Sequence, residues 1–279
     1  MEEHKTAVIV HGAWFTPKLY TKLRSGLERQ GYSIRCPFLP TCADALHKSV
    51  DDDIRVIRST LDELANAGHK ILVLMHSYGG VAGTEAVGEE WLYPNRKSSQ
   101  QGGVVGLVYL CAMLLPPATS MGDLLAKYGW LTELEVFTSA EGVNSIANPE
   151  VIMNDVDVDQ VGLTQASPRT VSSPVFKLEE ITSSITTVNR GAVTTAISEA
   201  PWKIIPTMYV LCKDDRAIKE ELQQAMVSDA NAESPDSEIR LESLEAGHCP
   251  WFSDEALKQI VGWIDLAWEN SIKDRMIYS

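Results

Sequence analysis

One short run of residues constrains the fold of this chain more than any other feature of its sequence. Residues 71–75, Ile-Leu-Val-Leu-Met, form an apolar stretch of strand length, and His-Ser-Tyr-Gly-Gly follows directly at 76–80. Such a run is typical of a buried strand, and the small residues after it predict a sharp bend into a helix. The bend would hold the hydroxyl of Ser77 above the edge of a sheet, although Met75 stands where such bends usually have glycine.

Similar apolar segments recur along the chain and alternate with segments of helical character. We predict strands at residues 6–10, 32–36, 71–75, 104–110, 207–211 and 237–241. Helices are predicted at residues 16–30, 46–67, 77–90, 218–228 and 254–268. Continuously apolar strands that alternate with helices are typical of a parallel sheet covered on both faces. The expected architecture is an α/β fold with a six-stranded, mainly parallel sheet flanked by helices.

Residues 116–201 interrupt this alternation, because they are rich in Ser, Thr, Asn and Asp. The scattered apolar anchors of this part of the chain include Trp130, Met153, Phe176 and Trp202. An unstructured loop of this length is implausible inside a compact domain. We therefore expect a mostly helical cap at 116–201, inserted into an α/β core formed by 1–115 and 202–279. The cap would lie above the C-terminal edge of the sheet, where open α/β sheets bind ligands.

The overall charge argues against some classes of partner. Lys and Arg number 24 against 38 Asp and Glu, which gives a net charge of −14 over 279 residues. An acidic surface repels nucleic acid and anionic lipid, so we expect neither as a partner. No apolar run reaches the ~18 residues of a membrane span, and we recognise no signal peptide at the N-terminus. Five cysteines without a C-x-x-C pair predict reduced thiols in a cytoplasmic protein.

Two further candidate residues follow strands downstream of Ser77, and their types suggest a proton relay. Asp214 and Asp215 come after the strand at 207–211, and His248 comes after the last predicted strand. Serine, acid and histidine in this order predict a triad, in which the imidazole takes the proton of the serine and the acid orients the imidazole. Position along the chain leaves both aspartates open.

Each of these residues also has an ordinary structural interpretation. A serine or an aspartate after a strand often caps the next helix, and His248 is one of six histidines in the chain. Cys249 beside it could act as the nucleophile in place of Ser77. The glycines at 79–80 favour a tight bend at the serine, and we take Ser77 and His248 as the candidate nucleophile and base.

Acyl transfer by a serine also needs backbone N–H groups that stabilise the developing oxyanion. We expect one from Tyr78, directly after the serine, and one from Ala13 in the loop after the first strand, with Trp14 as the alternative. Gly12 would let that backbone approach a substrate closely. The residues expected to line a pocket are Trp14, Met113 and Trp251.

Acidic clusters elsewhere do not predict a metal site. Three consecutive aspartates at 51–53 would point in different directions on a helix, so a charged helix start is the simpler interpretation. The run Asn-Asp-Val-Asp-Val-Asp at 154–159 lacks the glycine and the closing glutamate of a calcium loop, and we interpret it as part of the cap. The glycine motifs that bind dinucleotides or phosphates are absent from the sequence, and we expect no cofactor.

Four segments of the chain resemble a known family. They lie at residues 10–14, 76–80, 209–218 and 247–248. In order and type they are similar to the plant methylesterase and hydroxynitrile lyase branch of the α/β-hydrolase superfamily, and more so to uncharacterised fungal and bacterial members. The resemblance covers most of the core and little of the cap. It implies a cofactor-free fold in which Asp215 is the acid and Ala13 and Tyr78 supply the oxyanion donors. Several members dimerise, so a homodimer is a possible arrangement.

The branch includes esterases, cyanohydrin lyases and hormone receptors, so the resemblance leaves the reaction open. The interpretation we favour is a serine hydrolase that cleaves a small, mostly apolar carboxylic ester or lactone, for instance of secondary metabolism, through an acyl-enzyme. One alternative is a lyase or cyclase that uses the His-Asp pair as a general base, and another is a ligand-binding receptor. Lyases of the branch also use a cap lysine near the serine, for which Lys127 and Lys177 are the candidates.

Overall fold

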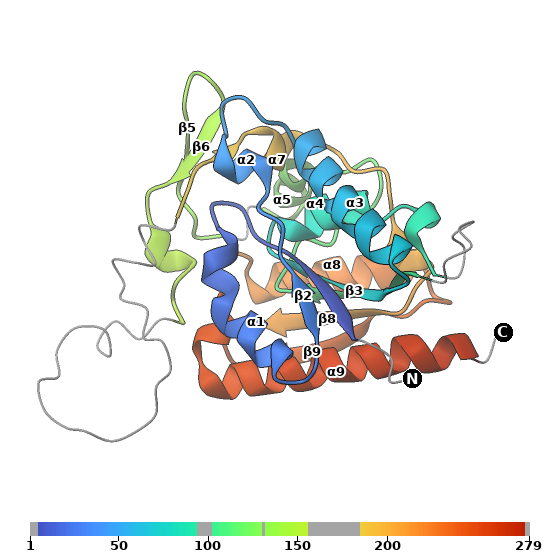
Figure 1. Cartoon of the computed structure of the whole chain (residues 1–279). Helices are drawn as coiled ribbons and strands as arrows, with labels where there is room; N and C mark the ends of the chain where they lie inside the picture. The colour runs from blue at the N-terminus through green and yellow to red at the C-terminus, as the bar shows by residue number, and fades with distance from the viewer. Residues whose placement is uncertain (1–4, 94–101, 130–131, 156–184, 277–279) are drawn as a thin grey trace, which may run out of the picture.

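A six-stranded parallel sheet forms the centre of the molecule (Figure 1). The structure, a computed structural model, describes residues 5–93, 102–129, 132–155 and 185–276. The strands are β1 (Thr6–Val10), β2 (Ser33–Arg35), β3 (Lys70–His76), β4 (Gly103–Leu110), β8 (Thr207–Cys212) and β9 (Arg240–Leu244). Their order is β2-β1-β3-β4-β8-β9, and each neighbouring pair is parallel. The predicted fold class is confirmed.

Burial explains why the central strands are continuously apolar. Every residue of β1, β4 and β8 is buried, and in β3 only the first residue, Lys70, is partly exposed. β2 and β9 lie at the two edges of the sheet and expose several of their residues. β9 starts at Arg240, later than the sequence predicts, because a turn in which the N–H of Ser237 donates to the carbonyl of Ser234 precedes it.

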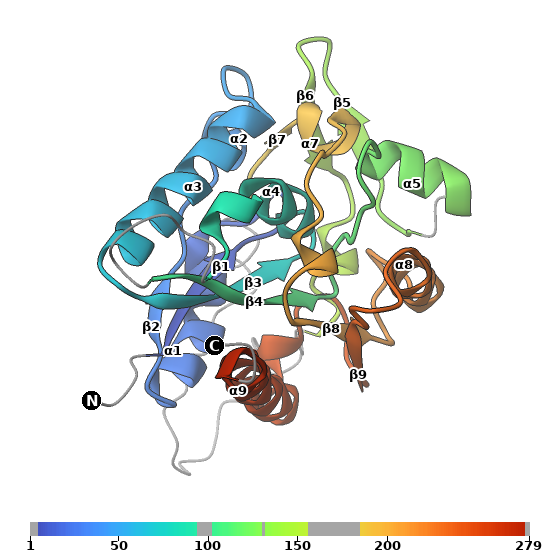
Figure 2. The ribbon, with the colours of Figure 1, turned by 90° about the vertical axis from the view of Figure 1, so that its right-hand side faces the viewer.

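Helices cover both faces of the sheet (Figure 2). They are α1 (Thr21–Glu28), which follows the 3-10 turn η1 (Pro17–Tyr20), α3 (Val50–Asn66), α4 (Gly79–Ala86), α8 (Glu220–Glu233) and α9 (Asp254–Met276). α1 and α9 lie on one face, and α3, α4 and α8 lie on the other. Successive strand residues point to opposite faces, so Val8 and Val73 belong to the cluster of α3, whereas Ile9 and Leu74 belong to that of α1 and α9.

The insert between β4 and β8 lies against the loops at the C-terminal ends of the strands (Figure 1). Its described elements are α5 (Met121–Tyr128), β5 (Val136–Thr138), β6 (Val143–Ile146), η3 (Pro149–Val151), β7 (Val188–Asn189) and α7 (Gly191–Thr194). We expected a mostly helical cap, and its described part also contains an antiparallel sheet of β5, β6 and β7. Met153 and Trp202 are buried anchors, whereas Trp130 and Phe176 lie outside the described residues.

Two expectations from the sequence concerned membrane spans and cysteines. No helix in the described ranges combines the length and the apolar character that crossing a membrane requires. All five cysteines are free, and every one of them except Cys36 is buried. The buried thiols contribute to packing as small apolar groups do.

Glycine is required where α4 crosses the sheet. A Cβ atom on Gly79 would lie 2.1 Å from the carbonyl oxygen of Val10, and one on Gly80 would lie 2.1 Å from the carbonyl oxygen of Met113. Both obstacles are backbone atoms, which cannot move aside as the end of a flexible side chain can. The crossing therefore depends on the absence of side chains at these two positions.

We predict that Gly80→Ala lowers the free energy of unfolding by at least ~2 kcal/mol, because overpacking displaces the backbone. Gly262→Ala is the matched control, since Gly262 lies on the exposed side of α9 with no atom within 4 Å of a Cβ. That change should raise stability by about 0.5–1 kcal/mol, because alanine favours the helix. Urea denaturation measures both changes, and a stable Gly80→Ala variant would contradict the close approach.

Candidate active site

Ser77 lies in the sharp turn that joins β3 to α4. Its φ is 55°, in the left-handed region that residues other than glycine rarely adopt. The carbonyl of Ser77 accepts hydrogen bonds from the N–H groups of Gly80 and Met113, at 3.0 Å each, and these bonds hold the strained turn. Ser77 is half-buried, while its neighbours His76 and Tyr78 are buried. The turn thus presents the serine at the end of the strand instead of packing it into the core.

Met75, which stands where such a turn usually has glycine, is accommodated by a glycine in α4. Its side chain is completely buried and points toward that helix. A Cβ atom on Gly83 would lie 2.7 Å from both Cγ and Sδ of Met75, so a larger residue at position 83 would require this side chain to move. The hydroxyl of Thr84 also donates to Sδ of Met75, at 3.9 Å.

His248 and Asp215 form a buried pair in the loops that follow β9 and β8. Nδ1 of His248 lies 2.7 Å from Oδ2 of Asp215, and their side chains are 2% and 0% exposed. Oδ1 of Asp215 accepts from the N–H groups of Ala217 and Ile218, at 2.7 and 2.9 Å. The carboxylate is therefore fixed, which places a proton on Nδ1 of His248 and leaves Nε2 as a base. Asp214, the other sequence candidate, is exposed.

A chain of buried hydrogen bonds connects three loops beside Ser77. The N–H of Gly12 donates to the hydroxyl of Tyr20 (2.9 Å), which donates to Nδ1 of His76 (2.5 Å). Nε2 of His76 donates to the carbonyl of His248 (2.9 Å). Burial holds the pKa of His76 well below its usual value, so the ring is neutral and both of its nitrogens are used. Sequence reasoning missed this bracing role, for which the position beside Ser77 is the only signal.

The loop after β1 approaches Ser77 closely. A Cβ atom on Gly12 would lie 2.9 Å from Cβ of Ser77, so a larger residue would force the two segments apart. In the part of the chain that the structure describes, the N–H groups of Ala13 and Tyr78 have no hydrogen-bond partner, although both residues are buried. Buried N–H groups without a partner are rare in folded proteins. These two flank the serine and form a candidate anion site.

Trp14 connects the same loop to the cap. Its φ is 64°, a second left-handed residue at the site, and its backbone N–H faces the thiol of Cys42. That contact makes Trp14 a poorer oxyanion donor than its neighbour Ala13. The carbonyl of Trp14 accepts from the N–H of Thr186 (2.7 Å), and its indole N–H donates to the carbonyl of Asn144 (3.2 Å).

Tyr78 has a second anchor that the sequence analysis did not identify. Its hydroxyl donates to Oδ2 of Asp53 (2.8 Å), and Thr41 donates to the same carboxylate through its N–H (2.9 Å) and its hydroxyl (2.6 Å). Asp53 is completely buried in the first turn of α3, and burial raises its pKa. The three aspartates at 51–53 do lie in the first turn of α3, as predicted, but Asp53 is buried and has a structural role beyond a charged helix start. The signal was its spacing, because buried residues stand three positions before it and four after it.

The three residues expected to line a pocket are all buried: Trp14 is 6%, Met113 1% and Trp251 0% exposed. The N–H of Met113 donates to the carbonyl of Ser77, and Trp14 lies in the loop after β1 that approaches the serine. Trp251 stacks on Tyr20 with ring centroids 4.7 Å apart, and its indole donates to the carbonyl of Leu19 (3.0 Å). Their role in lining a pocket stays a prediction.

One group of side chains among the described residues has the composition of a metal site. Ligand atoms of His76, Cys111 and His248 lie within 4.8 Å of one another. Both nitrogens of His76 and Nδ1 of His248 are already hydrogen-bonded. Burial raises the pKa of the Cys111 thiol well above its usual value, which disfavours the thiolate that a metal would need. The group fits a hydrogen-bonded core better than a metal centre.

Cys249, the alternative nucleophile, is also poorly suited to chemistry. It is completely buried, and its thiol donates to the carbonyl of Ile152 at 3.0 Å. Burial raises the pKa of this thiol well above its usual value. A nucleophilic cysteine needs an accessible thiolate, so the surroundings of Cys249 favour Ser77 as the nucleophile.

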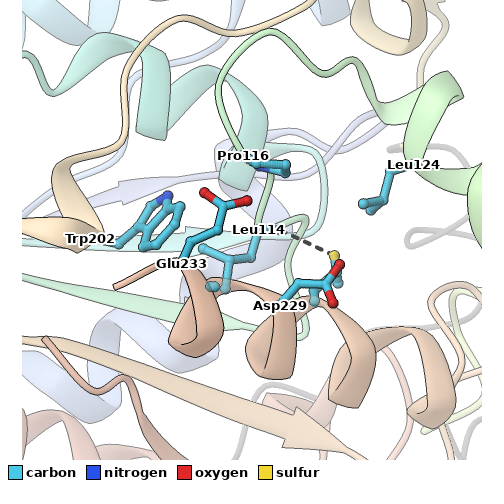
Figure 3. A pocket seen from close by; sticks show the side chains of 8 residues that line it. Leu114, Pro116, Leu124, Trp202, Asp229 and Glu233 are labelled. Atoms are coloured by element: carbon cyan, nitrogen blue, oxygen red, sulfur yellow. Dashed lines mark hydrogen bonds between the residues drawn. The ribbon is translucent and has the colours of Figure 1, made fainter. Parts of the chain in front are cut away.

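A small cavity lies between the start of the cap and α8 (Figure 3). Its volume is about 10 Å³, which leaves room for about one water molecule. The N–H of Leu114 points to Sδ of Met226 at 3.3 Å (Figure 3), and the indole N–H of Trp202 has no partner within the described ranges. The cavity is too small for an organic substrate and none of the candidate site residues lines it.

Comparison with known proteins identifies the family of this chain. Residues 7–260 match the family model described as the Alpha/beta hydrolase family. The chain is 25% identical over 252 residues to Alpha/beta hydrolase nvfD of Aspergillus novofumigatus, covering 90% of this chain and 92% of that protein. It is 23% identical over 263 residues to Methylesterase 7 of Arabidopsis thaliana, covering 88% of each.

Solved structures show the same fold at low sequence identity. A pyrethroid hydrolase from Sphingobium faniae JZ-2 has a TM-score of 0.67 and 20% identity, over 94% of this chain and 97% of that one. Polyneuridine aldehyde esterase has a TM-score of 0.69 and 15% identity, over 95% of this chain and 100% of that one. The family model covers most of the sequence, including Ser77, Asp215 and His248. This chain therefore belongs to the alpha/beta hydrolase family.

Proposed function

We propose that this protein is a serine hydrolase of small, mostly apolar carboxylic esters or lactones. Ser77 is the nucleophile, His248 the general base and Asp215 the acid that orients it. The buried pair of Asp215 and His248, 2.7 Å apart, carries the proposal, because an imidazole with a fixed Nδ1 proton is the base that a serine hydroxyl needs. The ring centroids of His248 and His76 are 4.6 Å apart, so the proposed base lies beside the residue that precedes Ser77.

The proposed reaction follows from these positions. Nε2 of His248 takes the proton of Ser77 as the hydroxyl attacks the substrate carbonyl, and it later returns the proton to the leaving alcohol. Asp215 orients His248 through Nδ1 and stabilises the imidazolium that forms. The N–H groups of Ala13 and Tyr78 bind the oxyanion, and losing one such donor costs about 3–4 kcal/mol in the transition state. Water then attacks the acyl-enzyme and releases the acid.

The substrate class is supported by charge, by the residues at the turn and by the relatives. The net charge of −14 disfavours anionic substrates at long range. Trp14 and Met113 give the surroundings of Ser77 an apolar character. Two of the relatives are esterases by name, a methylesterase and polyneuridine aldehyde esterase. We propose that the described cap residues bonded to the loops of Trp14 and His248 border the substrate pocket.

A non-hydrolytic lyase or cyclase that uses the His-Asp pair as a general base is the second candidate for this fold, and one of the two candidate cap lysines can be placed. Such a lyase would need a cap lysine near Ser77. Lys127 instead forms an ion pair with Asp229 of α8, with Nζ and Oδ2 2.6 Å apart, and its side chain is 59% exposed. Lys177 lies outside the described residues. Lys127 is therefore engaged by α8 in this structure and is not placed as that lysine.

We predict that Ser77→Ala reduces the hydrolysis of p-nitrophenyl acetate by at least ~1,000-fold, because the proposed acyl-enzyme forms on its hydroxyl. Cys249→Ala is the control for the alternative nucleophile and should keep most of the activity. Steady-state kinetics on both variants, with thermal unfolding to show that they are folded, measures the difference. Activity that survives in Ser77→Ala and disappears in Cys249→Ala would reverse the assignment.

Hydrolysis in ¹⁸O-labelled water separates the reaction types. We expect ¹⁸O in the product acid, because water attacks the acyl carbon in the second half of the reaction. Mass spectrometry of the product measures the incorporation. Turnover without ¹⁸O would point to lyase or cyclase chemistry, and tight binding of esters without any turnover would point to a receptor.

The bond between Tyr78 and Asp53 fixes the residue that supplies one proposed oxyanion donor. We predict that Tyr78→Phe lowers the free energy of unfolding by about 1–3 kcal/mol, because a buried carboxylate loses a donor. Since the pKa of Asp53 is raised in the folded protein, its contribution to stability falls as pH rises above the ordinary value of 3.8. The phenol stabilises the ionised form, so its removal should steepen this fall.

The matched control for that variant is Tyr209→Phe. The hydroxyl of Tyr209 is also buried but donates to the carbonyl of Ala112, at 2.8 Å, and not to a carboxylate. Its removal should cost stability to the same degree at each pH between 5 and 8, roughly the range in which the phenol stays neutral. Urea denaturation across this range compares the two variants, and parallel curves would show that Asp53 does not depend on the phenol of Tyr78.

A further inference from the structure

Two cap residues, Asn154 and Asp155, form hydrogen bonds with the loop that carries His248. Oδ1 of Asp155 accepts from the N–H of Gly247 (2.5 Å), and Oδ2 of Asp155 accepts from the N–H of Cys249 (2.7 Å). Oδ1 of Asn154 accepts from the N–H of His248 between them (3.3 Å). Three successive N–H groups of the histidine loop are thus bound by two adjacent side chains, which we call the cap clasp.

The cap clasp also reaches the loop of the acid. Nδ2 of Asn154 donates to the carbonyl of Asp214, the residue before Asp215, at 2.8 Å. Asn154 therefore bridges the two loops whose side chains pair in the site. A Cβ atom on Gly247 would lie 2.2 Å from Oδ1 of Asn154, so the loop has glycine where the cap clasp touches it.

The residues that precede the cap clasp are buried in the apolar core. The preceding residues, Val151, Ile152 and Met153, are 1%, 1% and 4% exposed and belong to the apolar cluster that also contains Trp251. The carbonyl of Ile152 accepts from the thiol of Cys249 as well. Buried apolar side chains and hydrogen bonds therefore both hold this segment in place.

The backbone of His248 is consequently held at both of its polar groups. Its N–H is bound by Asn154, and its carbonyl is bound by Nε2 of His76 at 2.9 Å. With the backbone fixed, few side-chain rotamers remain that keep Nδ1 on Asp215. Burial raises the pKa of Asp155, and its hydrogen bonds from the N–H groups of Gly247 and Cys249 oppose that shift, so the histidine loop stabilises the ionised carboxylate.

We propose that Asn154 and Asp155 are positioning residues, which hold His248 in the orientation that lets it act on Ser77. The inference rests on the proposed function of Ser77 and His248, and it assigns to the start of the acidic run at 154–159 a role beyond cap structure. The cap then takes part in catalysis by fixing the base, in addition to covering the site.

Asp155→Asn is the informative substitution, because it keeps the size of the side chain but leaves one oxygen for two N–H groups. We expect kcat to fall by about 10- to 100-fold with little change in KM, since a misplaced base slows chemistry more than binding. The rate at which a fluorophosphonate probe labels Ser77 should fall by a similar factor, because this reaction needs the same base. Asn154→Ala should slow both rates to a lesser degree and serves as the second variant if Asp155→Asn does not fold.

Glu150→Gln is the matched control. Glu150 lies in η3, close to the cap clasp along the chain, and is exposed, so the change removes one negative charge from the same segment without touching the histidine loop. It should leave both rates unchanged. Wild-type rates in folded Asp155→Asn and Asn154→Ala would overturn the inference, as would losses that only follow the unfolded fraction in a thermal melt.

A separate measurement distinguishes failure of the cap clasp from failure of the proposed function. If the wild-type protein neither hydrolyses esters nor reacts with the fluorophosphonate, the proposed function fails. The orientation of His248 can still be read from the far-downfield proton NMR signal of its Nδ1–H, which the short bond to Asp215 should produce. Asp155→Asn should shift or broaden this signal and Glu150→Gln should not. An unchanged signal in Asp155→Asn would overturn the inference independently of activity.

Discussion

The buried chain of hydrogen bonds from Gly12 through Tyr20 and His76 to the carbonyl of His248 is the constraint on which the geometry of this site depends. It joins three loops that follow different strands and that carry a proposed oxyanion donor, the nucleophile and the base. Because every member is buried, loss of any partner would leave an unpaired polar group, which is costly in a low dielectric. The neutral ring of His76 continues this series of hydrogen bonds, because its Nδ1 accepts from Tyr20 and its Nε2 donates to the carbonyl of His248.

The cap adds to this frame at two of the same loops. Trp14 in the loop after β1 is bonded to Asn144 and Thr186 of the cap, and the loop of His248 is bonded to Asn154 and Asp155. The core loops and the cap therefore share hydrogen bonds that neither could satisfy alone. Loss of the ordered cap would therefore also remove hydrogen bonds that hold the loops of the candidate site.

The sheet was predictable because burial on both faces leaves a direct mark on composition. β1, β3, β4 and β8 are continuously apolar, and their order places serine, acid and histidine at one edge. Short elements gave no such mark, so the three-stranded sheet of the cap was missed. The choice of Asp215 came only from resemblance, because both aspartates follow β8 and only the turn toward the N–H groups of Ala217 and Ile218 separates them.

The aspartates at 53 and 155 escaped sequence reasoning for a different physical reason. Each lies in an acidic run, where a charge on the surface is the simplest interpretation. Their partners, the phenol of Tyr78 and the N–H groups beside His248, are distant in the sequence, and only the folded chain brings them together. The binding of a carboxylate by several distant donors, whether it is buried like Asp53 or half-buried like Asp155, is thus a tertiary property that local pattern does not encode.

Met75 and Gly83 carry a consequence for recognising proteins of this kind. The methionine fills space under α4 that is open because position 83 has no side chain. A larger residue at position 83 would require the methionine side chain to shift, so the packing of the two positions is coupled. A motif that demands glycine two residues before the serine misses this chain, because it takes no account of the residue in the helix that faces position 75.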